Sequence, residues 1–197
     1  MLERLVQPLL QWSWLSSVPL RIAERFGIPS MTIANGQFFI VRQNAYKAIG
    51  GHEAIKNEIL DDLTLARTLT REGFSGGIAE GSSLAQTRMY SSNTALVEGY
   101  AKSLWKAFGN PFGTMVAIAL LSLTQIIPIV LGLSGYALGW ISYFMVASSH
   151  AMAAVRTKSR TTNIFLHPIS SFIIIVLICE SIRRKALGKI TWRGRYI

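Results

Sequence analysis

Cysteine is almost absent from this sequence of 197 residues, which limits the kinds of site that it can hold. Cys179, the single cysteine, lies in an apolar stretch, so the chain has neither an intrachain disulfide nor a cysteine-based zinc site. The three histidines, His52, His150 and His167, lie far apart and form no recognised metal-ligand motif such as HExxH. A histidine metal site is therefore not expected.

Acidic residues are scarce in the second half of the chain. Residues 1–110 carry eleven Lys or Arg and nine Asp or Glu, whereas residues 111–197 carry nine Lys or Arg and one acid, Glu180. The net charge of +10 belongs mainly to this apolar half. Cations beside apolar segments gain favourable energy from anionic lipid headgroups. A membrane is the expected partner, and nucleic acid is not, because the first 110 residues are nearly neutral.

Charged residues are missing altogether from residues 107–155, a run of 49 residues with a turn-like Leu133-Ser134-Gly135 near its middle. About 20 helical residues cross the hydrocarbon core of a bilayer. We therefore expect a transmembrane helical hairpin with spans at residues 112–133 and 136–155. A hairpin buried inside a soluble protein is the alternative.

A third apolar segment, residues 161–179, is just long enough to cross, but it begins with polar residues and contains His167-Pro168. Positive charges lie on both sides of it, so a simple crossing would put one cluster on the unfavoured face. A re-entrant segment bent at Pro168 would leave both clusters cytoplasmic, provided that protein contacts satisfy its backbone. Both topologies stay open. The flanking clusters are Arg156, Lys158 and Arg160, then Arg183, Arg184, Lys185, Lys189, Arg193 and Arg195.

The first 29 residues mix apolar and polar positions in a way that is typical of helices at a membrane surface. Trp12 and Trp14 supply the interfacial aromatic rings of this amphipathic segment. A secretory signal peptide is the alternative, but Glu3 stands in the would-be basic region and Pro8 interrupts the apolar core.

Residues 30–106 have the pattern of a soluble α/β unit. A strand is expected at residues 38–41 after the Asn35-Gly36 turn, and a short helix at residues 44–49. A second helix should begin near Asp61 and end at Gly73, which can adopt the left-handed cap conformation. Residues 76–79 then indicate the approach to a further strand.

Asp61-Asp62 is the sharpest chemical feature, because two carboxylates stand together at an expected helix start. Backbone N–H groups and the helix dipole favour anions there, so helix capping alone can explain the pair. The neighbouring motifs favour a chemical role.

Five short motifs follow one another along the chain, with the apolar spans before the last of them: Ala34-Asn35-Gly36-Gln37, Ala48-Ile49-Gly50-Gly51-His52, Leu60-Asp61-Asp62-Leu63-Thr64-Leu65-Ala66, Gln86-Thr87-Arg88-Met89-Tyr90 and Trp192-Arg193-Gly194-Arg195-Tyr196. Their order closely resembles the carboxy-terminal portion of membrane-bound family 2 glycosyltransferases. Hopanoid- and carotenoid-associated glycosyltransferases and ceramide glucosyltransferase are the members that it resembles most. The resemblance runs from residue 30 to the end. Each motif alone is weak evidence for the family, and all five in this order are strong evidence for it.

The resemblance implies an inverting transfer with Asp62 as the general base that deprotonates an acceptor hydroxyl. Asp61 would orient or tune Asp62. Asn35, Gly36 and Gln37 match a turn that lines the sugar and acceptor site, where glycine allows close backbone approach. The alternative for this turn is structural, since Asn-Gly is a common turn sequence.

Two further motifs match substrate-binding positions. Gln86, Arg88 and Tyr90 correspond to a stretch over the nucleotide diphosphate, where Arg88 can stabilise the leaving group. Tyr90 stands where the processive members have Trp, so the resemblance does not imply polymer synthesis. Trp192, Arg193 and Arg195 match a terminal tail that meets phosphate, and a lipid-headgroup anchor is an equal alternative for that tail.

The expected fold is α/β plus membrane helices: a partial GT-A (nucleotide-diphospho-sugar transferase) domain followed by the membrane region. The expected divisions are an interfacial amphipathic segment (1–29), the C-terminal half of the GT-A catalytic domain (30–106), the membrane region (107–182) and a basic cytoplasmic tail (183–197). The catalytic part is expected on the cytoplasmic face of the cell inner membrane or an equivalent membrane.

The implied metal and donor have no visible ligands, because the sequence contains no Asp-X-Asp motif. Mg²⁺ or Mn²⁺ and a nucleotide-sugar donor are implied by the resemblance, as is a lipid or isoprenoid-like acceptor. A separate N-terminal half would supply donor binding, and the chain alone is expected to be inactive. The alternatives are a small integral membrane scaffold or assembly protein and a transporter fragment, for which only His150 or His167 supplies an ionisable residue within the apolar segments.

Overall fold

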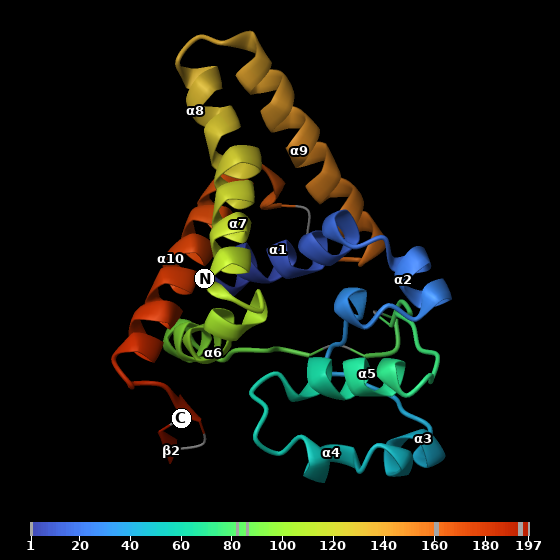
Figure 1. Cartoon of the computed structure of the whole chain (residues 1–197). Coiled ribbons are helices and arrows are strands. Elements are labelled where there is room, and N and C mark those ends of the chain that lie inside the picture. Colours follow the sequence, from blue (N-terminus) through green and yellow to red (C-terminus); the bar gives the residue numbers. More distant parts are fainter. Residues whose placement is uncertain (1, 82, 86, 160–161, 193–194, 197) are drawn as a thin grey trace. The chain divides into compact units, whose positions relative to one another are not determined.

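The structure is a computed structural model that describes residues 2–81, 83–85, 87–159, 162–192 and 195–196, with side chains up to residue 190 (Figure 1). The chain divides into two compact units. One comprises residues 13–87 and is called the middle unit here; the other comprises residues 1–12 and 88–197 and is called the membrane unit. Helix α1 (Leu2–Ser17) begins in the membrane unit and continues into the middle unit.

The middle unit is helical in its described residues. Leu65 and Ala66 bury one side of α5, and the Thr70 hydroxyl lies 3.2 Å from that of Thr32, beside η1. The Glu24 carboxylate on α2 accepts a hydrogen bond of 2.9 Å from the Ile78 N–H and thereby holds the segment after α5. The elements are α2 (Leu20–Phe26), the 3₁₀-helix η1 (Pro29–Met31), α3 (Gln43–Ala48), α4 (Gly51–Ala54) and α5 (Asp61–Arg71).

The expected α/β fold of residues 30–106 is wrong. Neither residues 38–41 nor residues 76–79 form a strand, and the described part of the middle unit contains no sheet. A strand persists only where a neighbouring strand takes up its backbone hydrogen bonds, and these two segments have no such neighbour. Ile40 is 81% exposed, so the apolar run does not bury its side chains either. The described residues therefore show no GT-A half-domain.

Both helices expected in this region are confirmed. Helix α3 covers residues 43–48, and α5 begins at Asp61. Gly73 follows the end of α5 with a φ of +81°, the left-handed conformation that glycine adopts without strain.

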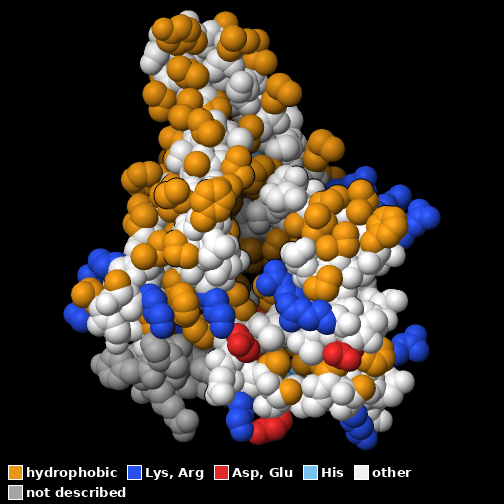
Figure 2. Space-filling model, viewed as in Figure 1, with side chains coloured by type: hydrophobic (Ala, Val, Ile, Leu, Met, Phe, Trp, Pro, Cys, Tyr) orange, Lys and Arg blue, Asp and Glu red, His pale blue; other side chains and the backbone are white. Residues whose placement is uncertain are grey.

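Helices long and apolar enough to cross a membrane occupy the two expected spans, 112–133 and 136–155, and they form a hairpin in the membrane unit. One arm runs from Pro111 to Leu133 and the other from Ala137 to Arg156. Figure 2 shows hydrophobic side chains over the visible face of this hairpin. The first arm consists of α7 (Pro111–Leu121), the π-helix η2 (Ser122–Ile126) and α8 (Ile127–Leu133), and the second is α9 (Ala137–Arg156).

The arms of the hairpin pack closely at two glycines near its tip. A Cβ atom on Gly139 would collide with the backbone N of Gly132 and would lie 2.7 Å from the Pro128 carbonyl oxygen. A Cβ on Gly132 would lie 2.9 Å from the ring of Trp140. Small residues at such crossings let membrane helices pack backbone to backbone.

We expect the substitution Gly139→Leu to separate the two arms. Overpacking of this kind costs typically about 1–3 kcal/mol, and here the obstacle is backbone that cannot rotate away. Thermal unfolding of the purified chain in detergent, followed by circular dichroism, should show a lower midpoint. Ser142→Leu, which adds the same side chain at an exposed position of α9, is the control. Equal midpoints for the two variants would contradict the tight crossing.

A third helix is long and apolar enough to cross a membrane: the 3₁₀-helix η3 (Ile164–Leu166) continues into α10 (His167–Ala186), together 23 residues. Pro168 occupies the first turn of α10, where its missing N–H costs no helical hydrogen bond. The helix therefore is not bent at Pro168; it begins there.

The direction of α10 decides between the two topologies left open by the sequence. Ser181, near the end of α10, accepts a hydrogen bond of 2.9 Å from the Trp105 N–H and donates one of 2.6 Å to the Ala101 carbonyl. Both partners lie on α6 (Asn93–Ala107), just before the hairpin begins. At the other end, the ring of His167 lies 5.0 Å from that of Tyr143, part-way along α9 toward the tip.

Helices α9 and α10 therefore run in the same direction, away from the hairpin tip. Consecutive membrane crossings would run in opposite directions. The segment between them returns toward the tip, because the Tyr143 hydroxyl donates a hydrogen bond of 2.8 Å to the Phe165 carbonyl. The Asn163 amide donates to the Arg4 carbonyl at 3.2 Å, a protein contact of the kind that a re-entrant segment requires. The contacts favour a re-entrant α10 over a third crossing.

The core of the membrane unit joins α1, α6 and α10. Val6, Leu96 and Ile178, one from each helix, are fully buried at its centre. Figure 1 shows α10 beside α7 and ending near α6. The chain ends in a minimal antiparallel pair, β1 (Thr191–Trp192) with β2 (Arg195–Tyr196), which is too short to form a sheet domain.

Candidate functional site

The structure brings together two of the motifs that the sequence predicts to form a site. In the middle unit, the Asp62 carboxylate accepts a hydrogen bond of 2.7 Å through Oδ2 from the Gly36 N–H, 26 residues away. Its Oδ1 accepts one of 2.7 Å from the Leu63 N–H. The side chain is half-buried. Each carboxylate oxygen has a second lone pair, so the group can still accept a proton or a hydrogen bond from an added hydroxyl.

Local sequence explains this contact. The Asn35 side chain accepts a hydrogen bond of 3.2 Å from the Gln37 N–H, which shapes the turn so that the Gly36 N–H points to Asp62. A Cβ at Gly36 would lie 3.1 Å from the Asp62 Oδ2 atom, so only glycine fits without displacing the carboxylate. Asp61, the other acid, accepts a hydrogen bond of 3.0 Å from the Asp62 N–H and starts α5.

Arg88 and Tyr90 belong to the membrane unit, where Glu3 on α1 engages both. The guanidinium Nε of Arg88 lies 3.6 Å from the Glu3 carboxylate and also donates to the Tyr90 carbonyl at 3.2 Å. The Tyr90 N–H donates to the other oxygen of Glu3 at 3.1 Å. Gln7, one turn along α1, donates to the Met89 sulfur at 3.0 Å. In this arrangement the Arg88-Met89-Tyr90 motif anchors α1.

Tyr90 also packs tightly against α6. A Cβ at Gly99 would lie 2.5 Å from its ring, and its centroid lies 5.8 Å from that of Tyr100. Burial raises the pKa of Tyr100 first, and the neighbouring Tyr90 and Glu3 raise it further. Burial, followed by the negative charge of Glu3, also raises the pKa of Tyr90. Both phenols therefore stay neutral at physiological pH.

Several of the expected site residues lie outside the described part of the chain. Gln86 and Arg193 are among them, as are the side chains of Trp192 and Arg195. No group of three or more His, Cys, Asp or Glu residues suited to a metal ion occurs within the described ranges. The residues described thus offer no ready set of ligands for the Mg²⁺ or Mn²⁺ that the resemblance implies.

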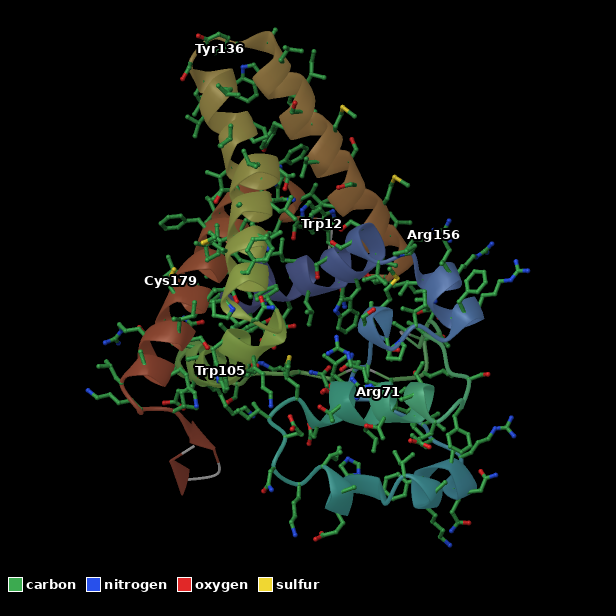
Figure 3. The ribbon with its side chains drawn as sticks, in the orientation of Figure 1. Trp12, Arg71, Trp105, Tyr136, Arg156 and Cys179 are labelled. Carbon is green, nitrogen blue, oxygen red and sulfur yellow. The ribbon has the colours of Figure 1, made fainter. Side chains whose placement is uncertain are left out.

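A column of aromatic rings in the membrane unit was not expected from the sequence. Trp12 on α1 stacks on His150 of α9 with ring centroids 4.5 Å apart and an angle of 9°. His150 stacks in turn on His167 of α10 at 5.3 Å and 14°, and His167 lies against Tyr143. The Trp12 indole N–H donates to the Ser149 hydroxyl at 2.8 Å. Figure 3 labels Trp12 on α1 beside α9.

The π-helix in the first arm supplies a polar group to this column. Gln125 is fully buried, and its Oε1 lies 3.1 Å from the His150 Nε2. Its Nε2 has no partner. Single π-turns in helices occur frequently at functional sites. In the sequence, Gln125 and His150 stand only as two isolated polar residues within apolar spans. Their pairing depends on the register of the two arms of the hairpin, which the sequence does not reveal.

Comparison with known proteins identifies no relative of this chain. No protein family, curated protein or solved structure matches this chain. The similarity to family 2 glycosyltransferases therefore rests on the order of the short motifs alone.

Proposed function

We propose that this chain is the acceptor-side part of an inverting, membrane-bound glycosyltransferase of the hexosyltransferase type. The Asp62 carboxylate takes the proton of an acceptor hydroxyl, whose oxygen attacks the anomeric carbon of the donor sugar. The bond from that carbon to the nucleoside diphosphate breaks, and the diphosphate departs with the bonding electrons. One base suffices, because no sugar becomes attached to the protein.

The observation that carries this proposal is the contact between Asp62 and Gly36. If the acidic pair only capped α5, no link to the Asn35-Gly36-Gln37 turn would be needed. Instead, the two motifs that the resemblance assigns to one site meet at 2.7 Å. The base is held by a backbone N–H and stays half-buried, which suits a carboxylate that must meet a substrate.

The membrane helices support a lipid-like or isoprenoid-like acceptor. In the described residues, three helices are long and apolar enough to cross a membrane, which suits a chain that acts at a bilayer, where such an acceptor is concentrated. We assign the transfer step to the cytoplasmic face of the inner or an equivalent membrane, because the basic residues that flank these helices favour that side. Donor binding, with its Mg²⁺ or Mn²⁺, is assigned to a partner polypeptide.

Deleting the gene in its source cell tests the proposal. Mass spectrometry of the membrane lipids should show the loss of one hexose-carrying lipid and accumulation of the corresponding lipid alcohol. Re-expression of the whole chain should restore the glycolipid. The rival function, a membrane scaffold without catalysis, predicts instead that glycolipids persist while a membrane complex loses a subunit. An unchanged lipid profile would rule out the transferase.

A further inference from the structure

The membrane unit contains a small, partly open pocket where α1 crosses the ends of α9 and α10. We call it the histidine pocket. Its volume is about 20 Å³, room for roughly one oxygen-sized group. Helix α1 closes one side, and α9 and the re-entrant segment close the other. The lining residues are Leu5, Pro8, Leu9, Gln11, His150, Ala153, Ala154, Ser159, Asn163, Ile164, His167 and Ser170.

His167 is the group that most needs a ligand. Its ring is 2% exposed, and neither of its nitrogens makes a hydrogen bond of 3.5 Å or less; the Tyr143 backbone carbonyl is only a weak, longer-range acceptor for it. The other polar groups at the pocket are engaged within the protein. His150 pairs with Gln125, Asn163 donates to a backbone carbonyl, and the Ser170 hydroxyl donates to the Leu166 carbonyl at 3.2 Å. Buried polar groups without partners are costly, so a ligand that bonded to His167 would be stabilised.

The chemistry of the lining selects a neutral ligand. None of the lining residues is Lys, Arg, Asp or Glu, so a phosphate or a cation would find no opposite charge. A neutral imidazole offers one donor and one acceptor. A hydroxyl group, which can both donate and accept, can bond to either one of these nitrogens in a space of this size.

The position of the pocket favours a hydroxyl carried by a lipid. His150 lies six residues before Arg156, or about 9 Å from the cationic end of α9 at 1.5 Å per residue. That depth is near the boundary of headgroups and acyl chains, where amphipathic groups settle. Met152 and Val155, which flank the pocket-lining Ala153 and Ala154, are 69% and 70% exposed. They leave an apolar surface beside the pocket for the rest of such a molecule.

We propose that the histidine pocket binds the hydroxyl group of a neutral membrane alcohol through His167, while the apolar body of the alcohol stays in the surrounding lipid. Only the head needs a pocket, because the bilayer already solvates the tail. The site is distinct from Asp62, and its occupation does not depend on sugar transfer. A single water molecule has the same hydrogen-bonding capacity, and the experiment is designed to separate the two.

The test uses the full chain purified and reconstituted in phosphatidylcholine nanodiscs. The probe is a long-chain primary alcohol with a diazirine beside the hydroxyl and a terminal alkyne; its methyl ether is the matched control. After irradiation, mass spectrometry should locate the alcohol on residues 150–170. The alcohol should label this region about fivefold more than the ether, the effect expected for one neutral hydrogen bond.

Two variants remove the site by different routes. His167→Phe keeps an aromatic ring and removes both nitrogens, and Ala153→Leu narrows the pocket without touching the histidine. Each should lower labelling by the alcohol to the level of the ether. His52→Phe, at an exposed histidine of the middle unit, should leave it unchanged. If His167→Phe does not fold, the labelling of Ala153→Leu decides whether the histidine pocket binds the alcohol.

Equal labelling by alcohol and ether would overturn the proposal and leave water as the occupant. Labelling that persists in the folded variants would overturn it as well. Asp62→Asn should retain full labelling, so the binding site and the transferase activity can fail independently of each other.

Discussion

Asp62→Asn is expected to lower the rate of sugar transfer by about 10²–10⁴-fold, the usual contribution of a positioned general base. Asparagine has almost the same shape as aspartate, and its amide oxygen can still accept the hydrogen bond from the Gly36 N–H. The turn and α5 therefore keep their arrangement. What is lost is the negative oxygen that takes the acceptor proton. Membranes from source cells carrying the variant, supplied with nucleotide sugar, give the rate directly.

Asp62→Ala separates the chemical role from the structural one. Alanine removes both the proton acceptor and the contact with Gly36. If Asp62 is the base, the asparagine and alanine variants are both inactive. If Asp62 only anchors the turn, the asparagine variant keeps its activity and the alanine variant loses it. Glu72→Gln, at the exposed opposite end of α5, is the control for loss of one negative charge from the same helix.

The two arms of the hairpin could be predicted from the sequence because their cause is local. A run of 49 residues without charge leaves few alternatives to membrane helices, and the Ser134-Gly135 turn divides it at the right place. Asp61 and Gly73 similarly mark the ends of α5, because the start and the left-handed cap of a helix depend on neighbouring residues.

The prediction of strands at residues 38–41 and 76–79 was wrong because a strand depends on residues far away in the sequence. Phe38-Phe39-Ile40-Val41 has the composition of a strand, but a strand depends on a partner that composition does not reveal. The polar contacts of the two units also differ in how much of them the sequence predicts. The resemblance assigns Asp62 and Gly36 to one site, but the hydrogen bond between them is a finding of the structure. The stack of His150 on His167 depends on how α9 and α10 lie side by side.

The direction of α10 leads to a second prediction, which concerns the face of the membrane on which its C-terminal end lies. A re-entrant α10 places its C-terminal end on the same face of the membrane as the end of α9. A third crossing would place it on the opposite face, with the hairpin tip. Three positions report the difference: Arg156 at the end of α9, Leu187 just after α10, and Tyr136 at the tip. Figure 3 labels Tyr136 and Arg156 at opposite ends of α9.

The measurement needs one cysteine at a time, and the sequence makes this simple because Cys179 is the only one to replace. Arg156→Cys, Leu187→Cys and Tyr136→Cys, each combined with Cys179→Ser, are exposed to a membrane-impermeant maleimide in sealed vesicles of known orientation. Arg156→Cys and Leu187→Cys should be labelled from one face and Tyr136→Cys only from the other. If Leu187→Cys is labelled together with Tyr136→Cys, α10 crosses the membrane. The basic residues at its two ends would then lie on opposite faces, against the preference of cationic loops for the cytoplasmic side.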